Sequence, residues 1–522
     1  DTVATFEGSV AIGASAATHP AHLLLALRGG GQGVYVGLAD GCFIVASEPY
    51  GVVELTDTYL RLDGETPANA DNPNASRGQI VVLDGTRAGT LEGITRQAYD
   101  GTDLPVTVDD LQRAQITTRD IDRGDFPHYL LKEITEAPAS FRKTLRGKLA
   151  DGPDGPRVTL GSDTLPEQLR SDLRDGTITR VQVIGQGTAH IAGSSLAAAL
   201  EAACPDGRLR IDSRPATELS GFGLRADMGD TLVIAISQSG TTTDTNRTVD
   251  LVRARGARVV AIVNRRQSDL TDKADGVLYT SDGRDVEMSV ASTKAFVTQF
   301  AAGFLLAWAI AEEVGGTVDP TLVEGLRALP AALEATIARR ASMATAAQQL
   351  APSRRYWAIV GNGTNRIAAE ELRIKLSELC YKAIACDATE DKKHIDLSSE
   401  PLILVCAAGL VGSTADDVAK EIAIYRAHKA TPIVIVSDGE ERFAAAYQVL
   451  TVPAAHPQLG FVLSAMAGHL FGYEAALAID AQARPLRAAR AAIEGAVGAG
   501  LSTDGDGLLR SLRPPLTAAA QR

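Results

Sequence analysis

The 522-residue chain lacks a basic excess and any long uninterrupted apolar run. Its formal net charge is −13 at pH 7, so no basic face is available for the phosphates of a nucleic acid. No apolar run reaches the roughly 18 residues of a membrane span, and no charged segment precedes an apolar stretch at the amino end. We therefore expect a cytoplasmic protein that binds neither nucleic acid nor membrane, which leaves a small anionic ligand open.

Cysteines are few and scattered. The five cysteines are odd in number and form no C-x-x-C pair, which argues against a disulfide framework and against a zinc site. We expect a reducing compartment, no metal and no cofactor. Cys42 lies inside a predicted strand and is interpreted as core packing.

The chain has 45% hydrophobic and 22% charged residues and is long enough for several globular domains. Residues 1 to about 90 are predicted to be β-rich, because short apolar runs alternate with glycine and aspartate. A polar stretch then leads into a helix predicted from "LLKEITEAPASFRKTLRGKL". A domain boundary is expected near residues 100 to 150.

An internal repeat follows. "VIGQGTAHIAGSSL" begins at Val183 and "IVGNGTNRIAAEEL" begins at Ile359. Each copy ends an apolar strand, starts a helix, and is followed by two further apolar strands. Nearly continuous Val/Ile/Leu strands alternating with helices indicate parallel sheets covered on both faces. The predicted fold class is therefore α/β, with two tandem doubly wound domains after a β-rich α+β segment.

The stretch "AISQSGTTTDT" (residues 235–245) ends one of these strands with hydroxyl side chains and a glycine. Such residues often only cap a helix. They can also cradle a phosphate, because a helix start offers unpaired N–H groups and glycine allows close approach. Gly185, Gly187 and Thr188 are expected at the neighbouring strand end, and two convergent polar turns favour a ligand.

Three motifs resemble those of glutamine–fructose-6-phosphate aminotransferases: "SQSGTTTDT", "VASTKAF" (residues 290–296) and "HYLLKEITEAP" (residues 128–138). The resemblance implies an amino-terminal glutaminase-like region and two sugar-isomerase (SIS) domains. It also implies homodimers or larger homo-oligomers that bind a hexose phosphate. The boundaries that we expect are a partial glutaminase-like domain at 1–100, a connector at 101–175, SIS domains at 176–335 and 336–480, and a tail at 481–522.

The resemblance assigns a phosphosugar site to the first SIS domain. The phosphate would lie against Ser237, Gln238, Ser239 and Thr242. The sugar would be lined by Gly187, Thr188, Val290 and Ser292. At the family's Cys-Gly-Thr-Ser turn this chain has Gln186-Gly187-Thr188-Ala189, so contacts from the first and fourth positions are not implied.

The resemblance also assigns catalytic roles. Glu378 in "ELRIKLSELCY" matches the isomerase base and Lys375 lies one turn earlier, where it could steady an oxyanion. Spacing alone instead favours a solvated, salt-bridged helix face. His394 matches the family's ring-opening histidine, which acts in the neighbouring subunit's site. A histidine in a charged loop is otherwise ordinarily solvated.

Two departures concern the nitrogen chemistry. The family's cysteine nucleophile and glutamine-binding stretch have no counterpart, so the chain as it stands is not expected to hydrolyse glutamine. The chain opens with Asp1, which leaves both processing and further upstream residues open. The last lysine is Lys429, and "ARPLRAARAAIE" carries Arg484, Arg487 and Arg490 where the family has its Schiff-base lysine.

Three functions follow as alternatives. The first is an amidotransferase-type enzyme that makes an amino sugar phosphate, the second a sugar-phosphate isomerase without amination, and the third a non-catalytic phosphosugar sensor. Retention of Glu378 and Lys375 argues against the third, because a sensor needs the phosphate cradle alone.

Overall fold

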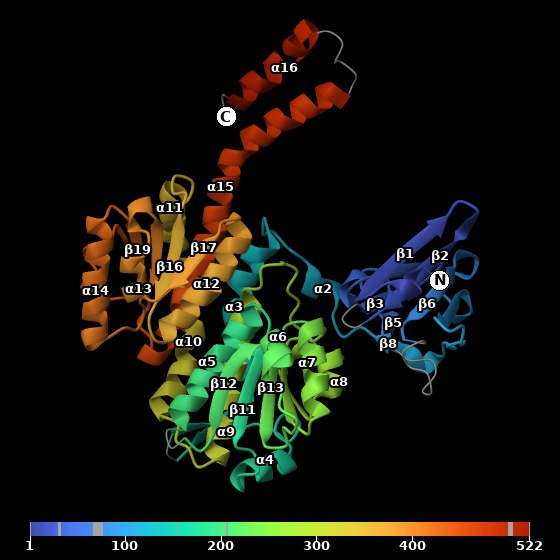
Figure 1. Ribbon diagram of the computed structural model, residues 1–522, viewed down its shortest axis with the longest axis horizontal. Coiled ribbons are helices and arrows are strands. Elements are labelled where there is room, and N and C mark those ends of the chain that lie inside the picture. Colours follow the sequence, from blue (N-terminus) through green and yellow to red (C-terminus); the bar gives the residue numbers. More distant parts are fainter. Residues whose placement is uncertain are drawn as a thin grey trace. The chain divides into compact units, whose positions relative to one another are not determined.

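The computed structural model describes residues 2–29, 33–65, 77–153, 155–204, 207–498 and 505–520. The chain forms two compact units, Asp1–Val323 and Glu324–Arg522. Figure 1 shows a β-sandwich followed by two α/β domains, in the order expected from the sequence.

The sandwich consists of two four-stranded antiparallel sheets with the orders β1-β2-β6-β7 and β4-β3-β5-β8. Leu25, Leu27, Val36 and Val81 pack between them. The strands are β1 (Val10–Ala16), β2 (His19–Arg28), β3 (Gly33–Ala39), β4 (Cys42–Ala46), β5 (Thr58–Asp63), β6 (Gln79–Asp84), β7 (Ile94–Ala98) and β8 (Leu111–Arg113). The sandwich thus includes β8, a strand in the stretch interpreted as linker from the sequence.

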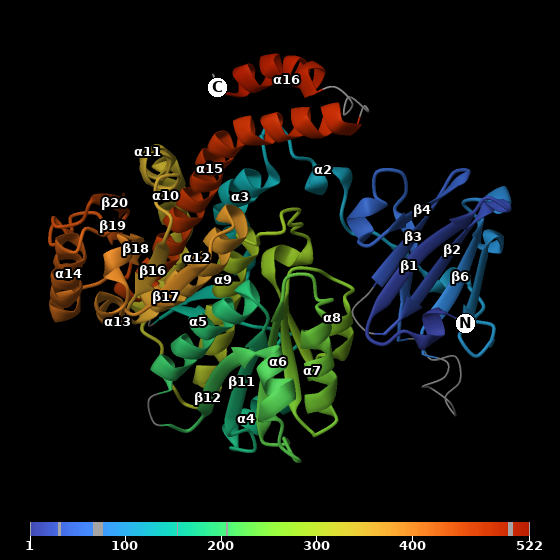
Figure 2. The ribbon, with the colours of Figure 1, turned by 45° about the horizontal axis from the view of Figure 1, so that its top comes forward.

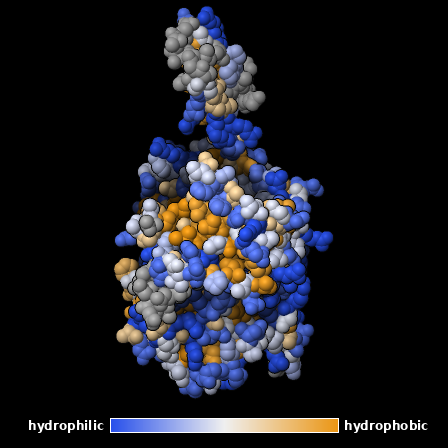
Figure 3. All heavy atoms as spheres, turned by 90° about the vertical axis from the view of Figure 1, so that its right-hand side faces the viewer, coloured by the Kyte–Doolittle hydropathy of each residue, from blue (hydrophilic) through white to orange (hydrophobic). Residues whose placement is uncertain are grey.

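Apolar side chains also lie on the outer surface of the first sheet. Ile12 and Leu24 are 38% and 41% exposed. Figure 3 shows apolar residues gathered on the side of the molecule that carries the sandwich. Strand alternation therefore does not divide this sheet into one apolar and one polar face.

A connector joins the sandwich to the first α/β domain. It contains α2 (Thr118–Ile121), α3 (Tyr129–Leu145), the hairpin of β9 (Leu149–Gly152) and β10 (Gly155–Val158), and α4 (Glu167–Arg174). The ring of Phe141 on α3 lies 6.1 Å from that of Phe300 on α9 (Lys294–Glu313), centroid to centroid. The predicted helix is thus packed against the first α/β domain.

The first α/β domain has a five-stranded parallel sheet with the order β12-β11-β13-β14-β15. The strands are β11 (Arg180–Gly185), β12 (Arg210–Pro215), β13 (Thr231–Ser237), β14 (Arg258–Val263) and β15 (Gly276–Tyr279). In Figure 1, α5 (Thr188–Ala203) and α9 cover one face, and α7 (Thr243–Arg253) and α8 (Asp269–Lys273) cover the other. The short α6 (Ala216–Glu218) packs beside α7.

The second α/β domain repeats this plan with the order β17-β16-β18-β19-β20. The strands are β16 (Trp357–Gly361), β17 (Ile384–Asp387), β18 (Leu402–Cys406), β19 (Thr431–Ser437) and β20 (Gln448–Val452), and the helices are α10 (Pro320–Ala338), α11 (Arg340–Leu350), α12 (Thr364–Cys380), α13 (Thr389–His394) and α14 (Gly412–Ala427). Figures 1 and 2 show α14 on one face of the sheet and α12 on the other.

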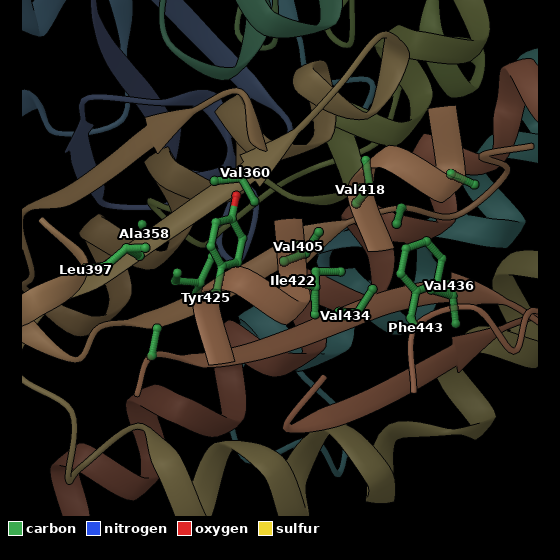
Figure 4. Packing of buried hydrophobic residues seen from close by; sticks show 14 residues of the cluster. Ala358, Val360, Leu397, Val405, Val418, Ile422, Tyr425, Val434, Val436 and Phe443 are labelled. Atoms are coloured by element: carbon green, nitrogen blue, oxygen red, sulfur yellow. The ribbon is translucent and has the colours of Figure 1, made fainter. Parts of the chain in front are cut away.

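The core under α14 is shown in Figure 4. Val360, Val405 and Val434 of the sheet meet Ile422 and Tyr425 of the helix. The Tyr425 hydroxyl donates a short hydrogen bond, 2.5 Å long, to the carbonyl of Thr389, the first residue of α13. The core thereby fixes the short helix whose last residue is His394.

The carboxyl-terminal part consists of α15 (Gly460–Gly498) and α16 (Gly505–Ala520). Among the described residues, Lys294–Glu313 and Pro457–Gly495 are long and apolar enough to cross a membrane by length and composition, which corrects the expectation that no segment reaches this length. Their apolar windows are 94% and 78% buried inside the protein. Both segments therefore serve as core helices of their domains.

Candidate active site

The predicted phosphate turn lies at the carboxyl end of β13, where the chain enters α7. Every residue of β13 is buried, and Ser237 at its end is 1% exposed. The Ser237 and Thr242 hydroxyls share a hydrogen bond of 3.1 Å, and Ser237 Oγ accepts the Gly240 N–H at 3.0 Å. Ser239 Oγ accepts from the N–H and the hydroxyl of Thr241. The turn is therefore a closed loop of hydroxyls at a helix amino terminus.

Gly240 is required by the shape of this turn. Its φ is +71°, and a Cβ there would lie 2.0 Å from Ser268 Oγ. A residue with a side chain would meet both backbone strain and a clash. The glycine predicted to permit close backbone approach is thus also needed for the turn to pack on α8.

The second predicted turn lies beside the first. β11 pairs in parallel with β13, so the Gln186–Thr188 turn after β11 and the Ser237–Thr242 turn open at the same sheet edge. Because β12 and β13 flank β11 on opposite sides, this edge is a topological switch point, where such sheets bind ligands. Thr188, the first residue of α5, is 8% exposed.

The repeat predicted from sequence is present in the backbone. Gly187 has φ 53° and ψ −128°, and Gly363 at the matching place before α12 has φ 56° and ψ −133°. In the second domain, however, Ala407, Ala408 and Gly409 follow β18 where the first domain has hydroxyls. The first domain therefore carries the turn suited to phosphate.

Val290 and Ser292 lie in the loop before α9. Val290 is 97% exposed, whereas the Ser292 hydroxyl donates a 2.6 Å hydrogen bond to Glu287. Gln238 and Ser239 line a small cavity together with Glu287 and Arg265. Sequence reasoning missed Arg265 and Glu287, because neither belongs to a motif and contacts across the fold bring them to the turn.

The structure brings the two predicted catalytic groups of α12 together. Lys375 Nζ lies 2.8 Å from Glu378 Oε2, with the lysine side chain 2% exposed and the glutamate 42% exposed. A solvated helix face, the interpretation from spacing alone, is therefore wrong for Lys375. The arrangement is a shielded ammonium that contacts an accessible carboxylate.

A second buried pair supports the same helix. His469 Nε2 on α15 lies 3.1 Å from Glu371 Oε1 on α12, and both side chains are fully buried. Glu371 precedes Lys375 by one turn. This pair was not predicted from the sequence, since its members lie 98 residues apart.

His394 ends α13 and is 69% exposed, 3.5 Å from Glu390. Asp396, two residues after His394, has a φ of +53°.

The cysteines are poorly suited to nucleophilic chemistry. Burial raises the pKa of Cys380 to about 12 and that of Cys386 to about 11. Cys42 begins β4 and is half-buried. Within the described residues, no group of three or more His, Cys, Asp or Glu side chains could hold a metal ion.

The three arginines expected at the position of the family's Schiff-base lysine lie within α15. Arg484 and Arg487 contact Asp480, and Arg490 contacts Glu494. Their side chains are 59% to 79% exposed. They form ion pairs along a solvated helix surface.

Comparisons with known proteins agree with this geometry. A family profile described as the SIS domain matches residues 178–309. The fold also matches the carboxyl-terminal domain of a glucosamine-fructose-6-phosphate aminotransferase from Francisella tularensis, with a TM-score of 0.61, 22% identity, and coverage of 69% of this chain and 98% of that one. A tagatose-6-phosphate ketose/aldose isomerase from Escherichia coli matches with a TM-score of 0.51, 18% identity, and coverage of 67% and 93%. The protein is thus of the SIS class.

Two sequence relatives identify the family. A glutamine–fructose-6-phosphate aminotransferase (isomerizing) from Symbiobacterium thermophilum is 30% identical over 446 residues, which cover 82% of this chain and 68% of the relative. The one from Thermus thermophilus is 31% identical over 399 residues, covering 74% and 63%. The chain belongs to the glutamine–fructose-6-phosphate aminotransferase (isomerizing) family. It matches about two thirds of the length of these relatives.

Proposed function

We propose that this protein binds a hexose phosphate, fructose 6-phosphate or a relative, and interconverts its ketose and aldose forms. In this proposal it is the isomerising part of an enzyme that makes an amino sugar phosphate such as glucosamine 6-phosphate. The observation that carries the proposal is the contact between the shielded Lys375 ammonium and the accessible Glu378 carboxylate. Membership of the family supports it.

The proposed chemistry needs one proton carrier and one cation. Glu378 removes a proton from C1 of the open-chain ketose and returns it to C2, so that an enediol forms and collapses to the aldose. Lys375 stabilises the negative charge that develops on the sugar oxygen, and its burial strengthens this interaction.

The phosphate is proposed to lie in the Ser237–Thr242 turn. Hydroxyl donors and the first N–H groups of α7 converge there, and a helix amino terminus favours an anion. Thr188, Gly187, Val290 and Ser292 would line the sugar.

A homodimer follows from the role proposed for His394, which would open the sugar ring in the neighbouring subunit's site. Its 69% exposure leaves the imidazole accessible to another chain.

A sugar-phosphate isomerase without amination is the second candidate. It is favoured by the exposed, ion-paired Arg484, Arg487 and Arg490, because a guanidinium stays protonated and forms no imine with the ketose.

Deuterium wash-in from heavy water at C1 or C2 of fructose 6-phosphate, followed by NMR, tests the isomerase. Glu378→Gln should slow the exchange by about 10²–10⁴-fold, the usual contribution of a positioned acid–base group. Glu370→Gln, the same change on the same helix in a residue paired with Arg366, is the control. Exchange undiminished in Glu378→Gln would place the base elsewhere. Binding without exchange in the parent protein would favour a phosphosugar sensor.

A further inference from the structure

Helix α3 contacts the loop before α9 through a buried carboxylate. Glu133 is 1% exposed, and its Oε1 accepts the backbone N–H groups of Met288 at 2.6 Å and of Ser289 at 3.1 Å. Its Oε2 is buried and has no hydrogen-bond partner among the described residues. One carboxylate oxygen therefore fixes two successive backbone groups of an irregular segment.

A second carboxylate holds the other end of the same loop. Glu287 Oε1 accepts the N–H groups of Thr293 at 2.8 Å and of Ala295 at 3.0 Å. Its Oε2 accepts the hydroxyl hydrogen of Ser292. Because that hydrogen is engaged, the Ser292 oxygen has only its lone pairs left to offer, and it would present an acceptor to a ligand.

A buried lysine completes the arrangement. Lys294 is 3% exposed, and its Nζ donates to the Val286 carbonyl at 3.0 Å and to Glu136 Oε2 on α3 at 3.2 Å. Burial opposes its charge, but the carboxylates of Asp285, Glu136 and Glu287 hold its pKa above the usual value. Helix α3 thus contacts the loop by two separate attachments.

Burying these charged groups costs more free energy than an apolar contact that only packs α3 against the loop would cost. Removing charged groups from water costs several kcal/mol each before partners compensate it, so an apolar contact would serve stability equally well. Burial raises the pKa of Glu133, and the charge of Glu287 raises it further, whereas hydrogen bonds from the Ser289 side chain and from the Met288 and Ser289 N–H groups lower it. The hydrogen bonds to the carboxylates fix the position of the loop backbone, although Val290 at the tip of the loop is 97% exposed.

We propose that Glu133 is a positioning residue of the sugar subsite: with Glu287, it fixes the Met288–Ser292 loop so that Val290 and the acceptor oxygen of Ser292 face the hexose. The inference rests on the proposed function. Under this inference, Glu133 on α3 contributes to the affinity for the sugar. It does not affect the affinity for phosphate, because the Ser237–Thr242 turn is closed by its own hydrogen bonds.

Titration calorimetry with fructose 6-phosphate and phosphorus NMR titration with inorganic phosphate test this division on the full chain. Glu133→Leu removes the acceptor and should weaken fructose 6-phosphate binding by roughly tenfold or more, since two hydrogen bonds to a charged acceptor are lost. Inorganic phosphate should bind as in the parent protein. Glu133→Gln keeps an acceptor oxygen and should restore most of the affinity. Thr135→Ala, on the exposed side of α3, is the control.

Two outcomes would overturn the inference. A folded Glu133→Leu protein that binds fructose 6-phosphate like the parent would show that the loop needs no such attachment. An equal loss of affinity for inorganic phosphate would show a general structural role.

Hydrogen exchange on the ligand-free parent needs no variant and guards against misfolding of Glu133→Leu. The Met288 and Ser289 amides should be protected from exchange. Fast exchange at both amides would show that Glu133 does not hold them. If the parent binds no fructose 6-phosphate while these amides are protected, the hydrogen bonds to Glu133 are present but serve no sugar site. Both the proposed function and the sugar-positioning role of Glu133 then fail.

Discussion

Replacing the hydroxyls of the Ser237–Thr242 turn tests where the phosphate binds. The variants are Ser237→Ala, Ser239→Ala and Thr242→Ala, singly and together. The three side chains differ in what they do without ligand. Ser237 is 1% exposed and accepts the Gly240 N–H, whereas Ser239 and Thr242 are only partly buried.

The expected loss of affinity follows from these hydrogen bonds. A hydrogen bond to a charged group contributes about 1.5–3 kcal/mol, so each lost hydroxyl should weaken hexose phosphate binding by about 10- to 100-fold. Ser237→Ala also leaves the Gly240 N–H without its acceptor, at a cost of about 1–3 kcal/mol in folding free energy. Ser239→Ala removes the acceptor of the Thr241 N–H, but this hydrogen bond is only partly buried, so the stability of this variant should change less.

Calorimetry with fructose 6-phosphate and thermal unfolding measure the two effects separately. Thr243→Ala, the same kind of change one residue into α7, is the control and should bind like the parent. A triple variant that binds fructose 6-phosphate as tightly as the parent would mean that the cradle is misplaced. A loss of affinity that tracks the loss of stability across the three single variants would show that these hydroxyls support folding and do not bind the phosphate.

Two further predictions concern stability and assembly. Hydrogen bonds from Arg225 lower the pKa of Asp230 from 3.8 to about 2; burial opposes this shift, and Thr231 and the charges of Arg225 and Arg180 support it. The contribution of Asp230 to stability is therefore present above about pH 4 and is lost as the pH falls towards 2. Thermal unfolding of Asp230→Asn should accordingly depend less on pH between 4 and 2 than that of the parent, and identical pH profiles would contradict this. Light scattering at micromolar concentration should show at least a dimer, since His394 is proposed to act in a neighbouring subunit; a monomer would remove that role.

The central strands of both α/β domains were predictable because their physical signal is local. β13, β14, β18 and β19 are buried on both faces and read as continuous apolar runs in the sequence. The edge strands β12, β15, β17 and β20 were not predicted. β12 has the sequence RIDSRP, with no fully buried residue, so only its pairing with β11 makes it a strand.

The residues of the candidate site also divide into those with a local sequence signal and those without one. The hydroxyl turn after β13 is contiguous in sequence, and a strand-to-helix junction with Ser, Gly and Thr has few structural solutions. Glu133 lies inside the quoted motif of residues 128–138, but its role was missed because its partners, the Met288 and Ser289 N–H groups, are distant in sequence. Glu287 precedes the motif of residues 290–296 and was missed because two of its partners there are backbone N–H groups, which residue types do not reveal. Glu133 is separated by 155 residues from the Met288 N–H that it accepts.

The helix α12 shows why side-chain spacing alone misjudged the surroundings of the candidate catalytic residue Lys375. Lys375 and Glu378 are three residues apart, a separation typical of exposed ion pairs that contribute little free energy. Packing of α15 on α12 changes this, because it places the fully buried Glu371–His469 pair one turn before Lys375 and leaves the lysine 2% exposed. A buried ammonium acts in a lower effective dielectric than a solvated one, so its attraction for a developing oxyanion is several times stronger. The same two residues on a solvated helix would offer a carboxylate base without an effective oxyanion partner. The oxyanion stabilisation proposed for Lys375 therefore depends on tertiary packing and not on the sequence motif.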